Sequence, residues 1–310
     1  MHHRSTAPLL AALAVVLTWG VNFPLQKALF GQVGPIGFLG LRYLLVPVCA
    51  VALLCWRFGS SWPRLDRGEV GPLVRLTLVG QGLHLLLSAY GMQGSTAFSA
   101  SVLLACGPVF TLLILRLSGI EKLSRGQVAG VAMAATGALV FTSDKLLAAD
   151  WQAGLGDLTL LAAAALFSYY TVAAKPLIQH HGGVTVLSYG SLICTLPMLL
   201  WCAPALALLD WAAQPAWVWT GTAWQTAGGG FIGWLAWGWA NEQRGVARTA
   251  PLIYLMPLVA GLTAWVWGGE TFTATKLLGA GVILAGVALA QFSPAQPSLR
   301  ARPPPPEPSC

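Results

Sequence analysis

Four polar side chains recur on one side of residues 72–92, a stretch that is otherwise mostly leucine, valine and glycine. They stand at i, i+4, i+7 and i+11, which an α-helix brings to one face: Thr77, Gln81, His84 and Ser88. All four can hydrogen-bond, and His84 can do so in either protonation state. Two interpretations stay open. The stripe lines a cavity for a polar small molecule, or it forms a hydrogen-bonded seam between helices.

A single arginine, Arg42, lies deep inside the apolar stretch 35–56. An arginine at the centre of a bilayer costs about 2.5–3.5 kcal/mol, so Arg42 must face water or a partner. Its guanidinium suits a carboxylate, which it binds through two parallel hydrogen bonds. The alternative is a structural arginine that bonds helix carbonyls or extends towards the membrane surface.

Further candidates lie in other apolar stretches. Asn22 continues a polar stripe at four-residue steps, although beside Pro24 it can also bond backbone groups that the proline frees. Trp234 and Trp237 stand at i and i+3, where they form either an apolar cavity wall or ordinary helix packing. Tyr90 and Tyr254 are candidates of the same kind.

Several kinds of chemistry are not expected. Residues 228–233 match G-x-G-x-x-G, but they lie in an apolar helical stretch without a preceding strand, so Gly229 and Gly233 indicate close helix packing. The sequence has no phosphate-binding loop and no H-E-x-x-H, and His84 has no acidic neighbour at helical spacing. We therefore expect no metal, no cofactor and no enzymatic activity.

The elements that carry these residues are predicted to cross a membrane. Of 310 residues, 56% are hydrophobic and 9% charged, against roughly a quarter charged in soluble proteins. Basic residues are scattered singly, so the partner is the lipid bilayer and not nucleic acid. Apolar runs long enough to span it predict an all-α polytopic protein of ten transmembrane helices: 7–27, 35–56, 72–92, 95–116, 125–143, 155–175, 184–206, 218–240, 246–267 and 275–292.

Basic residues predict the orientation. If the N-terminus is inside, thirteen lysines and arginines fall in cytoplasmic segments and three, Lys27, Lys145 and Lys276, fall outside. This bias places both termini in the cytoplasm.

The chain resembles itself when it is shifted by 149 residues. The shift aligns Pro108 with Pro257, Glu121 with Glu270, Gly130 with Gly279 and Gly137 with Gly286. Five spans per copy invert the second copy in the membrane. We predict a first five-helix repeat at 1–146, a second at 147–293 and a disordered Pro-rich tail at 294–310. Pro108 and Pro257 each remove a helix hydrogen bond at equivalent positions, which predicts hinges.

Several short motifs resemble the EamA-type branch of the drug/metabolite transporter superfamily over about residues 7–292. One departure is Ile120, where the family usually has glycine, as the second repeat keeps at Gly269. The motifs are residues 19–24 (WGVNFP), 41–43 (LRY), Pro108 followed by Glu121, 156–158 (GDL), and 254–257 (YLMP) followed by 269–270 (GE).

The resemblance implies a secondary transporter of the inner membrane that exports small metabolites, often amino acids, by alternating access. Relatives that carry phosphorylated substrates need several basic residues in the cavity, whereas here only Arg42 is deep. Neutral and aromatic amino acids are therefore the expected substrates, and hydrophobic drugs or other small metabolites are the alternative. A membrane scaffold or receptor without transport is the alternative of a different class. The sequence indicates no particular oligomeric state.

Overall fold

The protein is a bundle of helices, as the sequence predicts. The computed structural model describes residues 6–119, 123–147, 151–244 and 249–294, and these residues contain no strand. Glu121 and the tail from residue 295 lie outside these ranges. Six helical stretches of the described chain are long and apolar enough to cross a membrane. They are Ala7–Phe58, Arg67–Gln93, Ala97–Leu117, Gly154–Ala173, Gly183–Ala207 and Ala274–Phe292.

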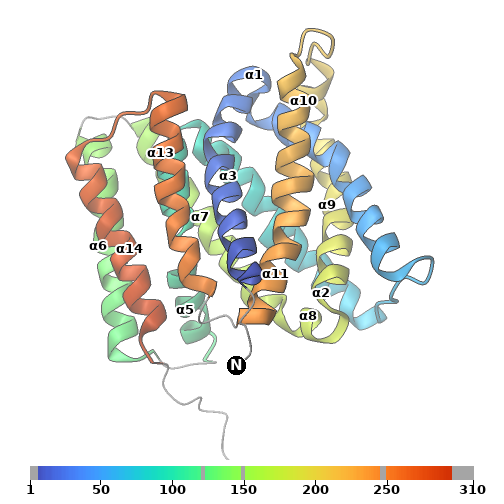
Figure 1. The fold of residues 1–310 in the computed structure, drawn as a ribbon, viewed down its shortest axis with the longest axis horizontal. Coiled ribbons are helices and arrows are strands. Elements are labelled where there is room, and N and C mark those ends of the chain that lie inside the picture. Colours follow the sequence, from blue (N-terminus) through green and yellow to red (C-terminus); the bar gives the residue numbers. More distant parts are fainter. Residues whose placement is uncertain (1–5, 120–122, 148–150, 245–248, 295–310) are drawn as a thin grey trace, which may run out of the picture.

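The first half of the chain begins with one long helix, α1 (Ala7–Phe58), which reverses at Gly34 (Figure 1). Gly34 has a φ of 69°, a conformation that glycine adopts without strain. The two arms of α1 contain the predicted spans 7–27 and 35–56. Then follow α2 (Arg67–Thr77), the π-helical η1 (Leu78–Leu83), α3 (His84–Gln93), α4 (Ala97–Leu104), α5 (Gly107–Leu117) and α6 (Arg125–Leu147).

The second half repeats this order of elements, with one short additional helix, α8 (Lys175–His181). Its second π-helical segment, η2 (Trp224–Ile232), joins α10 (Ala216–Ala223) to α11 (Gly233–Arg244). The other elements are α7 (Trp151–Ala173), α9 (Gly183–Ala207), the 3-10 helix η3 (Ala250–Leu255), α13 (Met256–Gly268) and α14 (Ala274–Phe292).

Corresponding elements of the two halves start 149 residues apart. This holds for α3 and α11, for α5 and α13, and for α6 and α14. The two π-helical segments, η1 and η2, also end 149 residues apart. The same shift that aligns the sequence thus aligns the breaks between helices.

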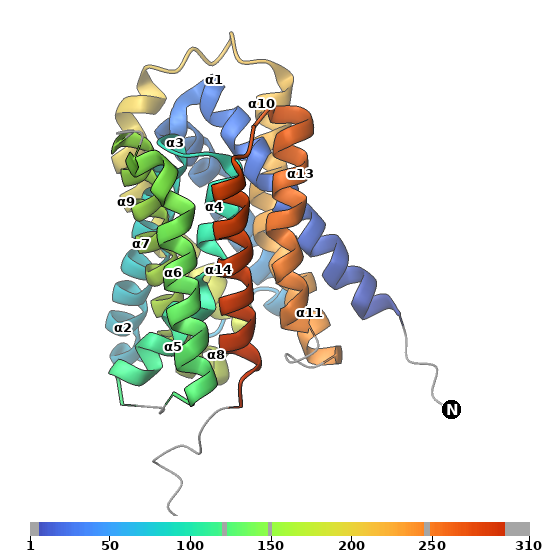
Figure 2. The same cartoon turned by 90° about the vertical axis from the view of Figure 1, so that its left-hand side faces the viewer.

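Helices α6 and α14 lie side by side (Figures 1 and 2) and exchange equivalent contacts. A Cβ on Gly130 would lie 2.4 Å from the Ala290 nitrogen, and a Cβ on Gly279 would lie 2.5 Å from the Phe141 nitrogen. Gly130 and Gly279 are 149 residues apart, as are Phe141 and Ala290. The two contacts are therefore related as a two-fold axis between the helices would relate them.

We expect the Gly286→Ala substitution to destabilise the protein. A Cβ on Gly286 would lie 2.4 Å from the Ala134 nitrogen, so α6 and α14 must move apart. Overpacking of this kind costs about 1–3 kcal/mol, which thermal unfolding in detergent detects as a lower midpoint. Gly281 is the matched control on the same helix, because a Cβ there meets nothing within 4 Å. A midpoint for Gly286→Ala equal to that of Gly281→Ala would contradict the close packing.

The two ends of the bundle differ. At the end where α1 begins and α14 finishes, here called the terminal end, lie α2 and α8 (Figures 1 and 2). At the opposite end, the Lys27 ammonium donates to the carbonyls of Met92, Gln93 and Ser95 at 2.6, 3.0 and 2.6 Å.

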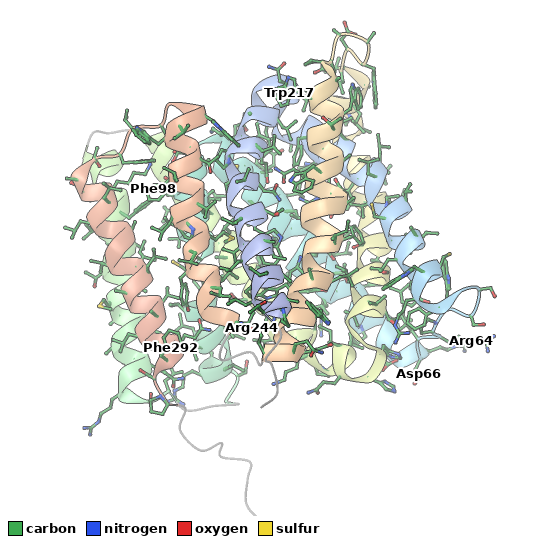
Figure 3. The ribbon with its side chains drawn as sticks, in the orientation of Figure 1. Arg64, Asp66, Phe98, Trp217, Arg244 and Phe292 are labelled. Carbon is green, nitrogen blue, oxygen red and sulfur yellow. The ribbon has the colours of Figure 1, made fainter. Side chains whose placement is uncertain are left out.

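A glutamate from the second half also stabilises the opposite end. The Glu270 carboxylate accepts hydrogen bonds from the backbone nitrogens of Ala97 at 2.8 Å and Phe98 at 3.4 Å. These nitrogens begin α4, where a negative charge is favourable. The two halves are thus tied together at this end, where Phe98 is seen in Figure 3.

Candidate functional site

A small cavity of about 60 Å³ lies among helices of both halves. Its walls come from the second arm of α1, from η1 and α3, from α9, and from η2 and α11. The lining residues are Arg42, Tyr43, Val46, Gln81, Leu85, Leu187, Ser191, Gly230, Phe231 and Trp234.

Both π-helical segments border this cavity, η1 through Gln81 and η2 through Gly230 and Phe231. A π-helical turn contains an extra residue, and such turns are frequent at functional sites. The extra residue also changes which side chains lie on the same face of the helix. Gln81 therefore lines the cavity, whereas the His84 ring turns to α7, where Nδ1 lies 2.8 Å from the Ala163 carbonyl oxygen.

The other two members of the predicted stripe, Thr77 and Ser88, lie outside the cavity wall. The Thr77 hydroxyl donates to the Leu73 carbonyl at 2.6 Å, which is a bond within its own helix. Ser88 is buried and does not line the cavity. Of the stripe in residues 72–92, Gln81 therefore lines the cavity, whereas Thr77 and His84 contact backbone carbonyls.

Residues related by the 149-residue shift line the same cavity. Arg42 corresponds to Ser191, Gln81 to Gly230, and Leu85 to Trp234, and all six line the cavity. The two halves contribute equivalent positions but different chemistry, a charged group from one and a small hydroxyl or glycine from the other. The cavity consequently lies where the halves meet and is polar mainly on the side of the first half.

Two polar atoms in the cavity wall have no hydrogen-bond partner among the described residues. These are Nε of Arg42, a donor, and Oε1 of Gln81, an acceptor. The other end of the Gln81 amide donates to the Ser191 hydroxyl at 3.4 Å. A buried polar atom without a partner costs about 1–3 kcal/mol, so both atoms favour a bound molecule that supplies an acceptor and a donor.

An aromatic array borders the cavity. The Trp234 ring centroid lies 5.9 Å from that of Trp19 and 6.1 Å from that of Phe167. The Trp237 ring centroid lies 5.6 Å from that of Trp19, and Trp237 does not line the cavity. The Trp19 indole nitrogen donates to the Gly229 carbonyl at 2.9 Å, which fixes the array to η2.

The remaining predicted candidates lie around the cavity or away from it. The backbone carbonyl of Asn22 accepts a hydrogen bond from the Gln225 side chain at 2.7 Å. The side-chain nitrogen Nδ2 of Asn22 lies 2.3 Å from where a Cβ on Gly229 would be. Asn22 thus holds η2 against α1. Tyr90 is 41% exposed. The Tyr254 hydroxyl bonds Gln291 on α14, and neither tyrosine lines the cavity.

Pro108 and Pro257 stand at equivalent helix starts. Pro108 is in the first turn of α5, and Pro257 is in the first turn of α13. Proline is favourable there because its missing N–H would have no partner within the helix. Each proline therefore follows a break between helices and does not bend a continuous one.

Sequence reasoning missed Ser191, Gly230 and Trp19. The shift of 149 residues held the signal for two of them, because it carries Arg42 to Ser191 and Gln81 to Gly230. The contact between Trp19 and Gly229 spans 210 positions and had no local signal. Gly229 and Gly233 pack closely against Asn22 and Trp19, and the segment η2 that holds residues 228–232 follows a helix.

Comparisons with known proteins show which family this chain belongs to. The model of the EamA-like transporter family matches residues 6–143 and again 154–292. A probable terminal-alkyne amino-acid exporter of Streptantibioticus cattleyicolor is 30% identical over 90% of this chain and 91% of its own. Probable amino-acid metabolite efflux pumps of Salmonella typhimurium and Escherichia coli are 29% and 26% identical, each over 91% of this chain and 93% of its own.

A solved structure described only as "Crystal structure of protein" has the same fold. It is 20% identical, with a TM-score of 0.60, over 93% of this chain and 97% of its own. The two family matches together span most of the described helices. This protein therefore belongs to the EamA-like transporter family and is a multi-pass membrane transporter.

Proposed function

We propose that this protein exports neutral and aromatic amino acids through the cavity between its two halves. The observation that carries the proposal is that two polar atoms of cavity-lining residues, Arg42 Nε and Gln81 Oε1, have no hydrogen-bond partner in the part of the chain that the structure describes. An amino acid offers the complement of both, a carboxylate for the guanidinium and an ammonium for the amide oxygen. Phe231, Trp234 and Leu187 supply an apolar surface for its side chain.

The names of the relatives support this substrate class. The relatives from Streptantibioticus cattleyicolor, Salmonella typhimurium and Escherichia coli are all described as exporters or efflux pumps of amino acids or their metabolites. Their alignments extend over nine-tenths or more of each chain, so the likeness includes the cavity-lining helices.

Export requires the cavity to open. Its volume of about 60 Å³ is well below the roughly 300–1,000 Å³ of ordinary small-molecule sites. We propose that residues 1–146 and 147–293 are inverted repeats that rock against each other, which alternately exposes the cavity at each end. The breaks before Pro108 and Pro257 are the proposed hinges, and the hydrogen bonds of Glu270 to Ala97 and Phe98 are proposed to hold the two halves together at the opposite end.

We also propose the orientation in the membrane. Ten crossings of the inner membrane place the terminal end of the bundle in the cytoplasm, because the predicted inside segments carry thirteen basic residues against three. Arg64 and Arg244 lie at that end in Figure 3, and Trp217 lies at the other.

Transport by exchange or facilitated diffusion fits the cavity best. Carriers driven by protons or sodium usually keep a carboxylate at membrane depth, and no acidic side chain is among the described residues that line the cavity. Counterflow in proteoliposomes tests the function. A labelled amino-acid panel should enter vesicles that are preloaded with the unlabelled compound, saturably and without enhancement by a pH gradient.

Hydrophobic drugs are the second candidate substrates, because the aromatic wall of Phe231 and Trp234 also suits molecules without a carboxylate. A drug that competes with amino-acid counterflow would support this candidate. A scaffold or receptor would show no saturable exchange of any compound.

We expect Trp234→Ala to change selectivity. Trp234 lines the cavity, and burial of an aromatic side chain against it contributes about 1.5–3 kcal/mol. Counterflow of phenylalanine should fall about tenfold relative to counterflow of alanine. Trp237→Ala is the matched control and should have a smaller effect, since Trp237 contacts Trp19 and is not among the residues that line the cavity. Equal effects of both variants on both substrates would contradict the role of Trp234.

A further inference from the structure

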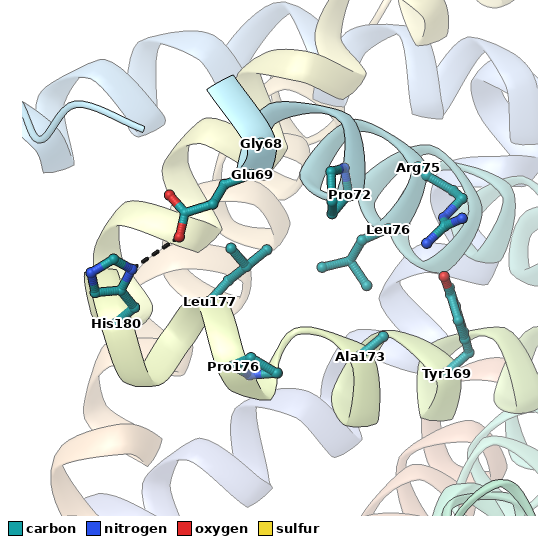
Figure 4. Close-up of a pocket in the computed structure, with 10 residues that line it drawn as sticks. All are labelled: Gly68, Glu69, Pro72, Arg75, Leu76, Tyr169, Ala173, Pro176, Leu177 and His180. Atoms are coloured by element: carbon teal, nitrogen blue, oxygen red, sulfur yellow. Dashed lines mark hydrogen bonds and ion pairs between the residues drawn. The ribbon is translucent and has the colours of Figure 1, made fainter. Parts of the chain in front are cut away.

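A glutamate and two consecutive histidines meet at the terminal end of the bundle, outside the central cavity. Glu69 lies in the first turn of α2, and His180 and His181 form the last turn of α8. His180 Nδ1 lies 2.9 Å from Oε1 of Glu69, as Figure 4 shows, and His181 Nε2 lies 2.8 Å from Oε2. The three groups can each offer one ligand atom, and these atoms lie within 4.8 Å of one another.

The arrangement of the two histidines is unusual for a helix. Side chains at consecutive positions on a helix point in different directions. Both rings nevertheless contact the carboxylate of Glu69. Both histidines lie in the last turn of α8, which ends before Gly182, a residue with a φ of 81°. The ring centroids lie 4.3 Å apart, so the end of α8 gathers two imidazoles on the side that faces α2.

We propose that Glu69, His180 and His181 bind a divalent transition-metal ion of the zinc type. Two imidazole nitrogens and a carboxylate oxygen are a ligand set that Zn²⁺ takes at about 2.0–2.2 Å. In a tetrahedral site at these lengths, neighbouring ligand atoms are about 3.4 Å apart. Each ring and the carboxylate must therefore separate by about half an ångström. The 63% exposed His180 side chain can move, and at the 10% exposed His181 the carboxylate of Glu69 has to move instead.

The surroundings of the cluster orient the carboxylate and give water access to it. The Asp66 backbone nitrogen donates to Oε2 of Glu69 at 3.1 Å, which orients the carboxylate as outer partners orient metal ligands. A cavity of about 420 Å³, lined by Glu69 and His180 among others, adjoins the cluster. Water from this cavity can complete the coordination, and Arg75 stands at the far side of the cavity in Figure 4.

Zn²⁺ titration of the purified full-length chain without an affinity tag tests the site. We expect saturable binding of one ion per chain, and Co²⁺ in its place should give the intense visible bands of a tetrahedral centre. Glu69→Gln and His181→Ala should each weaken binding at least about tenfold, since even outer-shell changes cost that much. Glu69→Gln is the matched variant because glutamine at this position preserves the capping box of α2.

The chain has two further histidines near its start that can compete for a metal ion in solution, and they supply the control. His2 and His3 follow the amino terminus directly. The double substitution His2→Ala, His3→Ala should leave one ion per chain and the Co²⁺ bands in place. The proposal is overturned if the parent shows no saturable binding, if the double substitution abolishes it, or if Glu69→Gln and His181→Ala bind as the parent does.

The metal would connect the two halves, because α2 precedes residue 147 and α8 follows it. A consequence that rests on the proposed function is that Zn²⁺ slows amino-acid counterflow in the parent and much less in Glu69→Gln. Counterflow without metal reports on the proposed function, and only its change with Zn²⁺ reports on the bridge. Equal inhibition of both proteins would contradict the bridge.

Discussion

Replacement of Arg42 by alanine is expected to lower the counterflow of carboxylate-bearing substrates by about tenfold to a hundredfold. The guanidinium lines the cavity, and its Nε has no partner among the described residues, so a substrate carboxylate can bond it. Hydrogen bonds to charged groups contribute about 1.5–3 kcal/mol. Since about 1.4 kcal/mol corresponds to a factor of ten, this range corresponds to the expected loss of counterflow. Initial rates of counterflow at subsaturating substrate measure it.

Two variants control this experiment. Arg42→Lys keeps the charge but loses the planar fork that binds a carboxylate through two bonds, so it should retain an intermediate rate. Arg57→Ala removes an exposed arginine from the last turn of the same helix and should exchange normally. If Arg42→Ala folds and exchanges amino acids at the parental rate, Arg42 is a structural residue.

Substitution of Gly230 by leucine is expected to block exchange almost completely. Gly230 lines the cavity, and a Cβ on it would lie 3.7 Å from Nη2 of Arg42. The rest of a leucine side chain fills a substantial part of the 60 Å³ and covers the guanidinium. Counterflow should therefore fall by at least about tenfold, since the substrate loses its charged hydrogen bonds.

Alanine at the same position separates obstruction from misfolding. A Cβ on Gly230 makes only ordinary contacts, 3.4 Å or longer, so Gly230→Ala should fold and exchange at a reduced rate. Gly238→Leu places the same bulk on α11 where a Cβ meets nothing within 4 Å, and it should leave exchange unchanged. Parental exchange by a correctly folded Gly230→Leu would exclude this cavity as the path.

The sequence predicted the fold class well because its signal is simple. Apolar runs between polar or Gly/Pro breaks place the helix boundaries within a few residues, as at 125–143 for α6 and 275–292 for α14. One difference is at Gly34, where the two predicted spans form one helix that reverses. The chain there stays helical between residues 28 and 33, and a single glycine makes the turn.

Prediction of the candidate site was less complete, for physical reasons. A periodicity of 3.6 grouped His84 with Gln81, but the π-helical segment η1 separates them, and only Gln81 lines the cavity. Spacing of i and i+3 selected Trp237 with Trp234, although only Trp234 lines the cavity. The first case depends on a local departure from α-helical geometry and the second on how α11 packs in the bundle, and the spacing of residues reveals neither.

The most direct test of the central claim is counterflow of phenylalanine beside counterflow of phenylalaninamide, in the same proteoliposomes. The two compounds share the ring and the amino group and differ in the carboxylate that Arg42 is proposed to bind. Saturable exchange of phenylalanine, with at least about tenfold less exchange of the amide, is the predicted result. Equal exchange of both compounds, or saturable exchange of the amide alone, would contradict recognition of a carboxylate in this cavity.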